Sequence, residues 1–210
     1  MQIEWRGLWG YGEALLAQRS YRELVIGRAA SGALWLLEHP PVVTLGRREV
    51  AVDEDRIRTA GYALVSCERG GLATCHEPGQ LVGYLIRDVS GVGIRCAVHA
   101  IEAGLIGWLA AVGVEACRRA GAPGVWVGSN KIAALGLHVR RGVTIHGFAL
   151  NLTNTLRGFE LITPCGITDG GVTNVVRCAG ASPSPEAAWQ AVGAAVALAF
   201  DALDSPEARR

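Results

Sequence analysis

The chain has 210 residues, of which 50% are hydrophobic, and a formal net charge of +1. This length is typical of one globular domain, residues 1–210, with a sizeable core, and the balanced charge argues against nucleic acid as a partner. The six cysteines form no C-x-x-C pair and no regular metal spacing, which favours free thiols in a cytoplasmic protein over a disulfide framework or a metal site. The sequence indicates no signal peptide, and its apolar stretches are too interrupted to predict a membrane span.

Helices and strands alternate along the chain. Apolar residues recur at helical spacing over residues 11–29 and 97–120, and a third helix is expected from Pro185 to about Leu203, with Ser184 as its N-cap. Strand-like runs are found at residues 33–38, 42–46, 62–68, 80–88, 124–127, 131–139 and 143–153. Clustered strands and few helices predict an α+β fold, with a mixed, largely antiparallel sheet flanked by helices.

Three polar stretches interrupt this apolar background. Residues 69–84 contain four glycines, which either admit a ligand close to the backbone or simply form a long turn. No G-K-[ST] follows, so this is not a phosphate loop. Residues 131–152 carry Lys131 and His146, and residues 159–173 carry Cys165 between Pro164 and Gly166.

Cys165 and Lys131 are the candidate reactive groups. Most free cysteines are inert buried residues, but Cys165 begins a glycine-rich turn that can present its thiol to a cleft. A nucleophilic thiol needs a neighbouring base or positive charge. Lys131 is the only lysine among 20 basic residues. A lysine amine can accept a proton when burial lowers its pKa, whereas arginine cannot. A lone lysine can also occur by chance, so composition alone leaves a Cys–Lys dyad open.

Together these stretches resemble the lipoyl(octanoyl) transferases of lipoate biosynthesis. Residues 69–84 match that family's signature R-G-G-x-x-T-x-H-x-P-G-Q-L-V-G-Y. "KIAALG" resembles its lysine strand, "HGFALNL" its H-G-x-A-L-N segment, and "PCGI" with "GVT" its cysteine motif. Residues 36–48, "LLEHPPVVTLGRR", are also similar, so the resemblance spans nearly the whole chain.

The resemblance implies a fold shared with lipoate and biotin protein ligases, and transfer of an octanoyl group from octanoyl-acyl carrier protein. The acceptor would be a lysine of a lipoyl domain, in 2-oxoacid dehydrogenases or the glycine cleavage H protein. Cys165 would carry the acyl group as a thioester and Lys131 would lower its pKa, with no cofactor, ATP or metal. Substrate would be bound by Arg69, Gly70, Gly71, Leu72, Ala73, Thr74, Cys75, His76, Ala134, Leu135, Gly136, Gly147, Phe148 and Ala149, supported by His146 and Gln80.

An eight-carbon chain needs an apolar slot, and four of these residues are expected to form part of it: Leu72, Ala134, Leu135 and Phe148. Backbone N–H groups of the glycine-flanked turn at Cys165 and of residues 70–76 are candidate donors to the oxyanion that forms during acyl transfer.

Two residues depart from the family signature. Cys75 stands where an aromatic residue is usual, and Glu77 where glycine is usual. We expect loss of the ring at position 75 to enlarge the wall of the slot, and Glu77 to change the local backbone. These departures leave two alternatives to the transferase: an octanoyl amidotransferase acting between lipoyl domains, and a weakened paralogue that only binds lipoyl domains.

Overall fold

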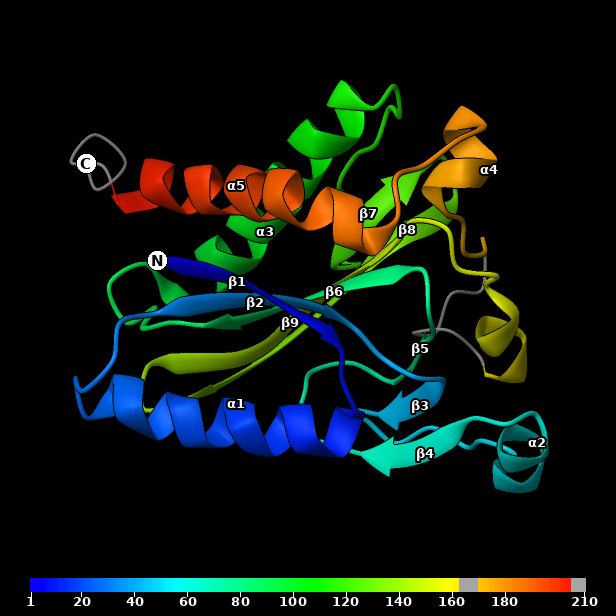
Figure 1. Cartoon of the computed structure of the whole chain (residues 1–210), viewed down its shortest axis with the longest axis horizontal. Helices are drawn as coiled ribbons and strands as arrows, with labels where there is room; N and C mark the ends of the chain where they lie inside the picture. The colour runs from blue at the N-terminus through cyan, green and yellow to red at the C-terminus, as the bar shows by residue number, and fades with distance from the viewer. Residues whose placement is uncertain (163–169, 205–210) are drawn as a thin grey trace.

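The computed structural model describes residues 1–162 and 170–204. Six strands form the main sheet in the order β1-β2-β6-β9-β8-β7, in which only the β1–β2 pair is parallel (Figure 1). These strands are β1 Gln2–Leu8, β2 Ala33–Glu38, β6 Gln80–Ile86, β7 Gly124–Val127, β8 Asn130–Arg140 and β9 Val143–Asn151.

A second, three-stranded sheet has the order β4-β3-β5. Its strands are β3 Val42–Leu45, β4 Ala63–Ser66 and β5 Ala73–His76. Residues 39–41, between the strands predicted at 33–38 and 42–46, therefore separate strands of two different sheets. Proline lacks the N–H that a sheet ladder needs, so Pro40 and Pro41 suit the point where the chain leaves the main sheet.

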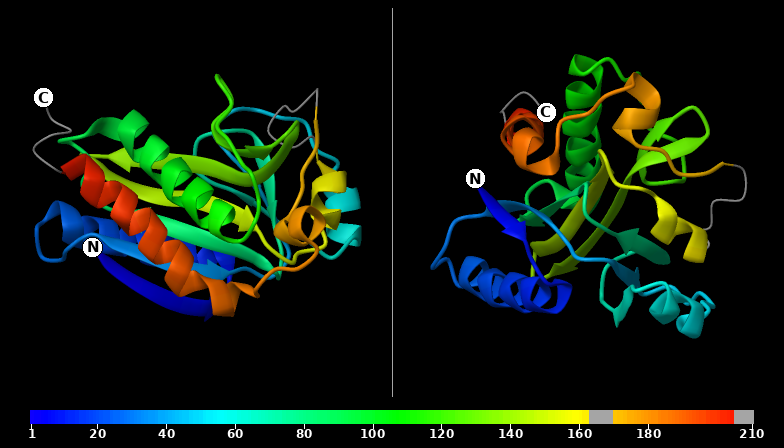
Figure 2. Two further views of the ribbon diagram at one scale, coloured as in Figure 1. Left: turned by 90° about the horizontal axis from the view of Figure 1, so that it is seen from above. Right: turned by 45° about the vertical axis from the view of Figure 1, so that its right-hand side comes forward.

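Helices cover both faces of the main sheet. Helix α1 lies on one face, and α3 and α5 pack against each other on the opposite face (Figures 1 and 2). The helical segments are α1 Tyr11–Ile26, α2 Glu54–Thr59, α3 Gly93–Ala111, α4 Val175–Ala179, α5 Pro185–Asp204 and a 3₁₀ turn, η1, Arg157–Leu161. The predicted α+β class, a largely antiparallel sheet flanked by helices, is confirmed.

The prediction for the second long helix was wrong at both ends. Helix α3 starts at Gly93 and stops at Ala111, well before residue 120. Gly113, with φ of +79°, takes the chain out of the helical conformation. Cys117 then exchanges two backbone hydrogen bonds with Trp126 of β7, so this segment extends the sheet region instead.

Helix α3 is long and apolar enough to cross a membrane, judged by length and composition alone. Its buried residues include Ala97, Ile101, Leu105 and Leu109, which belong to the main hydrophobic core. Packing against α5 and the sheet accounts for this apolar character.

Several short elements were not predicted: β1, β5, α2 and α4. All four residues of β5 are buried, so the strand has none of the alternation that marks a half-exposed strand. Strand β5 is important because it carries part of the site described next.

Candidate functional site

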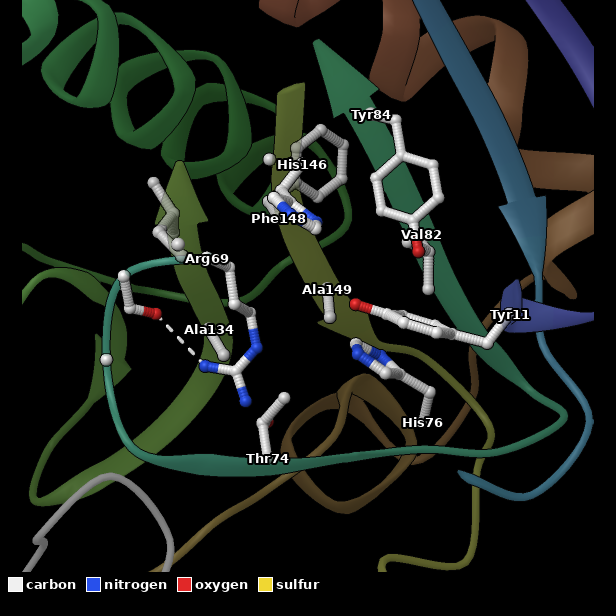
Figure 3. Close-up of a pocket in the computed structure, with 15 residues that line it drawn as sticks. Tyr11, Arg69, Thr74, His76, Val82, Tyr84, Ala134, His146, Phe148 and Ala149 are labelled. Atoms are coloured by element: carbon white, nitrogen blue, oxygen red, sulfur yellow. Dashed lines mark hydrogen bonds between the residues drawn. The ribbon is translucent and has the colours of Figure 1, made fainter. Parts of the chain in front are cut away.

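A pocket opens between the segment 69–76, the strands β6, β8 and β9, and the start of α1 (Figure 3). It contains about 440 Å³ of empty space when the open solvent at its mouth is included. The predicted residues that line it are Arg69, Gly70, Gly71, Thr74, His76, Ala134, Leu135, Gly136, His146, Gly147, Phe148 and Ala149. Three stretches that are distant in sequence therefore meet at one cavity.

Arg69 holds the glycine loop at the edge of the pocket. Its buried guanidinium donates to the Thr44 carbonyl at 2.6 Å and to the Thr44 hydroxyl, and also to the Gly70 carbonyl (dashed line in Figure 3). The next residue, Gly71, has φ of +93°, a conformation that strongly favours glycine. Arg69 therefore stabilises this wall of the pocket through its hydrogen bonds to Thr44 of β3.

The same loop also approaches β8 closely. The Gly70 N–H donates to the Leu137 carbonyl at 3.2 Å, so this amide is already engaged and does not serve as an oxyanion donor. A Cβ atom at Gly136 would lie 2.9 Å from the Gly70 carbonyl oxygen. Glycine at position 136 is therefore needed for the loop to pack against the strand.

Phe148 forms an apolar part of the wall by packing over glycine. A Cβ atom on Gly83 would lie 2.2 Å from the Phe148 ring. His146, two residues before Phe148 in β9, has a left-handed backbone conformation, with φ of +62°. Such backbone strain in a non-glycine residue is common at functional positions.

Tyr11, Val82 and Tyr84 also line the pocket, although sequence analysis did not select them. Tyr84 ends the glycine-rich signature and lies two residues beyond Val82, so strand alternation from Gln80 could have suggested both. Tyr11 gave no local signal. It begins α1, and only the packing of that helix on the sheet brings its ring against His76, in the stacked arrangement seen in Figure 3.

Three histidines around the pocket are kept neutral near pH 7 by burial. Desolvation lowers the pKa of His39 to about 4 and that of His146 to about 3, and it lowers the pKa of His76 as well. Glu68 lies 4.0 Å from His146, but a neutral imidazole forms no ion pair with it. The pocket therefore presents little charge from its imidazoles and suits a neutral chain.

Hydrogen bonds set the orientation of two of these rings. His39 Nδ1 lies 2.6 Å from the Trp9 carbonyl, so it carries the proton and Nε2 accepts from the Tyr84 hydroxyl at 2.5 Å. His76 Nδ1 lies 2.8 Å from Oε1 of Gln80, which places Gln80 behind His76 as a supporting residue rather than in the wall.

Some wall groups remain available to a ligand. The Tyr11 hydroxyl, Thr74 Oγ1 and His146 Nε2 are buried and have no hydrogen-bond partner within residues 1–162 and 170–204. They add polar contacts to a mainly apolar cavity, as small-molecule sites usually do.

Leu72 and Cys75 do not line the pocket, contrary to expectation. Cys75 is buried in a separate cluster with Leu156 and Phe159. Leu72 is only partly buried, and its carbonyl accepts a hydrogen bond from Gly46. Ala73 is fully buried and lies outside the pocket lining too.

Lys131 lies at the start of β8, beside the pocket rather than in it. Only 7% of its surface is exposed. Its Nζ lies 4.7 Å from the centre of the Trp126 ring and donates to the Pro123 carbonyl at 3.2 Å. Lys131 lines a second cleft, which shares Gly70, Gly71, Leu135 and Gly136 with the first.

Cys165 falls in residues 163–169, outside the described part of the chain, so its relation to Lys131 stays a prediction. The chain that follows is described. Backbone hydrogen bonds join the Lys131 N–H to the Gly171 carbonyl and the Thr173 N–H to the Lys131 carbonyl. Residues 171–173 of the cysteine motif thus run alongside Lys131. Among the described residues, no group of three or more His, Cys, Asp or Glu could hold a metal ion.

Comparison with known proteins gives one consistent family. Residues 10–197 match the model for the lipoyl protein ligase A/B catalytic domain. The chain is 44% identical to an octanoyltransferase of Thiobacillus denitrificans over 174 residues, which cover 82% of this chain and 76% of that protein. It is 40% identical to an octanoyltransferase of Rhodococcus opacus over 215 residues, covering 96% and 81%.

Solved structures share the fold at low sequence identity. A lipoate protein ligase from Thermoplasma acidophilum with bound lipoic acid has a TM-score of 0.69 at 18% identity, covering 96% of this chain and 84% of that one. A biotin protein ligase from Aquifex aeolicus has a TM-score of 0.55 at 10% identity, covering 97% and 70%. The predicted likeness to the lipoate and biotin ligase fold is confirmed.

Proposed function

This chain belongs to the lipoyl protein ligase A/B catalytic domain family. On that premise we propose that it is an octanoyltransferase of lipoate biosynthesis. Residues 1–210 form its single catalytic domain in this proposal. The observation that carries the proposal is the pocket. The glycine loop and the strands β8 and β9 form a largely apolar cavity with neutral imidazoles, in a chain 40–44% identical to octanoyltransferases.

The apolar lining of this pocket would stabilise a bound octanoyl chain. Ala134, Leu135, Phe148 and Ala149 supply apolar wall. Burial contributes about 0.8 kcal/mol per methylene, so a chain of this length gains several kcal/mol in total. The carbonyl of the acyl group can form hydrogen bonds with the Tyr11 hydroxyl, Thr74 Oγ1 or His146 Nε2.

In the first half-reaction, the Cys165 thiolate attacks the carbonyl carbon of the donor thioester. A new C–S bond forms, the tetrahedral intermediate collapses, and the donor leaves as a thiolate that takes up a proton. One thioester replaces another, so the step is close to isoenergetic and needs no ATP. Octanoyl-acyl carrier protein is the donor we propose.

In the second half-reaction, a lysine amine of a lipoyl domain attacks the acyl-enzyme. A C–N bond forms, the C–S bond to Cys165 breaks, and the amine loses a proton. Amide formation from a thioester is downhill. A bipartite lipoate protein ligase of the same fold from Thermoplasma acidophilum has been described together with its E2 lipoyl domain, which favours a lipoyl domain as the acceptor here.

Lys131 is the proposed proton acceptor in both halves. Its amine is buried against an indole ring, next to the pocket and beside residues 171–173 of the cysteine motif. A buried lysine amine can act as a general base when desolvation lowers its pKa, and this is the role proposed for Lys131. A cytoplasmic location, where carrier and lipoyl domains are found, completes the proposal.

Intact-mass measurement tests this function. Incubation with octanoyl-acyl carrier protein should add one octanoyl group, labile to hydroxylamine and absent in a Cys165→Ser variant. Adding a lipoyl domain should then move the group to its lysine. Acylation only from an octanoylated lipoyl domain would assign the chain as an amidotransferase, and no adduct from any donor would leave a binding module.

A further inference from the structure

Helix α1 buries a glutamine in a face that otherwise packs apolar residues on the sheet. Gln18 is fully buried and lies about one helical turn after Ala14 and Leu15, which belong to the core on this side of the sheet. Its Nε2 has no hydrogen-bond partner among residues 1–162 and 170–204. A buried amide with an unsatisfied donor lowers stability, so packing alone does not account for a glutamine at this position.

The other end of the same amide binds the backbone of the pocket wall. Oε1 of Gln18 accepts a hydrogen bond from the His146 N–H at 2.8 Å. Strand β9 lies between β6 and β8, so a regular residue of β9 would direct its N–H to one of these strands. The N–H of His146 is directed to a helix on the face of the sheet instead. Gln18 therefore stabilises the left-handed conformation of His146.

This conformation determines where the His146 ring points. Ile145 and Ala149 belong to the core on the α1 side, and Phe148 belongs to the core on the other side. Strand alternation would place residue 146 on the same side as Phe148. The ring of His146 instead lies edge-on to Tyr84, a residue of the α1-side core, with 6.3 Å between ring centres. It lines the acyl pocket there (Figure 3).

The orientation of this ring matters for a bound acyl group. His146 Nε2 is buried and has no partner in the part of the chain that the structure describes. The nearest carboxylate oxygen, on Glu68, is 4.0 Å away, which is too far for a hydrogen bond. A neutral imidazole nitrogen can donate a hydrogen bond to a carbonyl oxygen. The carbonyl is the one oxygen that an octanoyl thioester offers.

We propose that Gln18 is a positioning residue of the transferase, which holds His146 in its left-handed conformation so that Nε2 meets the carbonyl oxygen of the bound acyl group. The inference rests on the proposed function and adds a residue to it. Gln18 lies behind the described wall of the pocket and acts only through His146. Such a support is expected where a strained residue serves a site.

The test measures the rate at which octanoyl-acyl carrier protein acylates the enzyme, followed by intact mass at a low donor concentration. Gln18→Leu fills a similar space without an acceptor and should slow acylation about twofold to tenfold, the range for one neutral hydrogen bond. Gln18→Glu retains an acceptor oxygen whether or not it is ionised, so it should acylate at close to the wild-type rate.

A double-mutant cycle separates positioning from a general structural role. Glycine adopts a φ of +62° without strain, so His146→Gly removes the ring and keeps this backbone conformation accessible. His146→Gly should slow acylation, and adding Gln18→Leu to it should cause no further loss of rate, although the double variant should unfold at a lower urea concentration than His146→Gly alone. A variant that acts through the ring has no effect on the rate once the ring is gone.

Gln190→Leu is the matched control, because it makes the same substitution at an exposed position of α5. It should retain the wild-type rate. Urea unfolding of each variant verifies that rates are compared between folded proteins.

Each other result has a definite meaning. A wild-type rate in Gln18→Leu or in His146→Gly would overturn the inference, and so would a Gln18→Glu variant as slow as Gln18→Leu. An undiminished effect of Gln18→Leu in the His146→Gly background would show that Gln18 does not act through the ring. All of these outcomes leave the transferase intact, whereas no acylation of the wild type by any octanoyl donor would refute the proposed function itself.

Discussion

The Tyr62 hydroxyl donates a 2.6 Å hydrogen bond to the carboxylate of Glu77, which is 4% exposed. The same carboxylate accepts from the backbone N–H of Leu156 at 2.6 Å and from the Asn154 side chain at 3.3 Å. Glu77 has no positive φ, unlike Gly79. Glu77 therefore does not occupy the left-handed conformation that favours glycine, and its carboxylate anchors the segment 154–158.

Removing this carboxylate should destabilise the protein. Glu77→Ala leaves buried donors on Tyr62, Asn154 and Leu156 without their acceptor, and each such loss costs about 1–3 kcal/mol. We expect the free energy of unfolding in urea to fall by about 2–4 kcal/mol. Tyr62→Phe should lose about 1 kcal/mol. Glu115→Ala, at an exposed position, should change little; an equal loss there would contradict the role given to Glu77.

Restoring an aromatic residue at position 75 should affect stability rather than specificity. A Cβ atom added at Gly158 would lie only 2.0 Å from the Cys75 sulfur, so the Cys75 side chain is already tightly packed against Gly158. Cys75→Tyr should destabilise the protein by about 1–3 kcal/mol through overpacking and leave acyl-length preference unchanged. A shifted preference among hexanoyl, octanoyl and decanoyl donors would show that position 75 reaches the pocket after all.

Enlarging a side chain of the pocket itself should change specificity. Ala149 lies in the pocket wall and is 4% exposed. In Ala149→Leu the added carbons occupy space that the acyl chain would use, so the optimum should move to donors shorter by one or more carbons. Competition between hexanoyl and octanoyl donors measures this, and an optimum that stays at octanoyl would place the chain elsewhere.

Lys131→Arg should abolish enzyme acylation at neutral pH, because a guanidinium retains charge but accepts no proton. Lys131→Met, which removes the charge while preserving an apolar stem, should be equally inactive. Loading of each variant by octanoyl-acyl carrier protein is read by intact mass, with urea unfolding as the fold control. Wild-type loading of the arginine variant would exclude Lys131 as a base.

Acid should destabilise the fold through its buried histidines. The pKa of His39 is lowered to about 4 and that of His146 to about 3, whereas unfolded imidazoles titrate near 6.5. Between pH 6.5 and 4 the unfolded state binds protons that the folded state does not, so the free energy of unfolding falls as pH decreases. Proton NMR should find both imidazoles neutral at pH 5.5; titration midpoints near 6.5 would contradict their burial.

Local pattern was sufficient for much of the fold. Periodicity located α1, and the Ser184–Pro185 pair located the start of α5, where the Ser184 hydroxyl accepts from the Ala187 N–H. Strands β7, β8 and β9 also lie where predicted. Helical and strand periods are properties of a few consecutive residues, so they can be read without knowing what those residues contact.

The family, the largely antiparallel sheet and most of the pocket residues could be predicted before the fold was known, because the glycine loop and the H-G-F-A-L segment carry their chemistry in consecutive residues. The folded chain was needed to show that Tyr11 joins the pocket wall, that Cys75 packs away from it, that Tyr62 donates to Glu77, and that Lys131 lies over Trp126 in the second cleft. These relations depend on strand pairing and helix packing between distant segments. No period along the chain encodes which side of a buried strand such as β5 will meet the ligand.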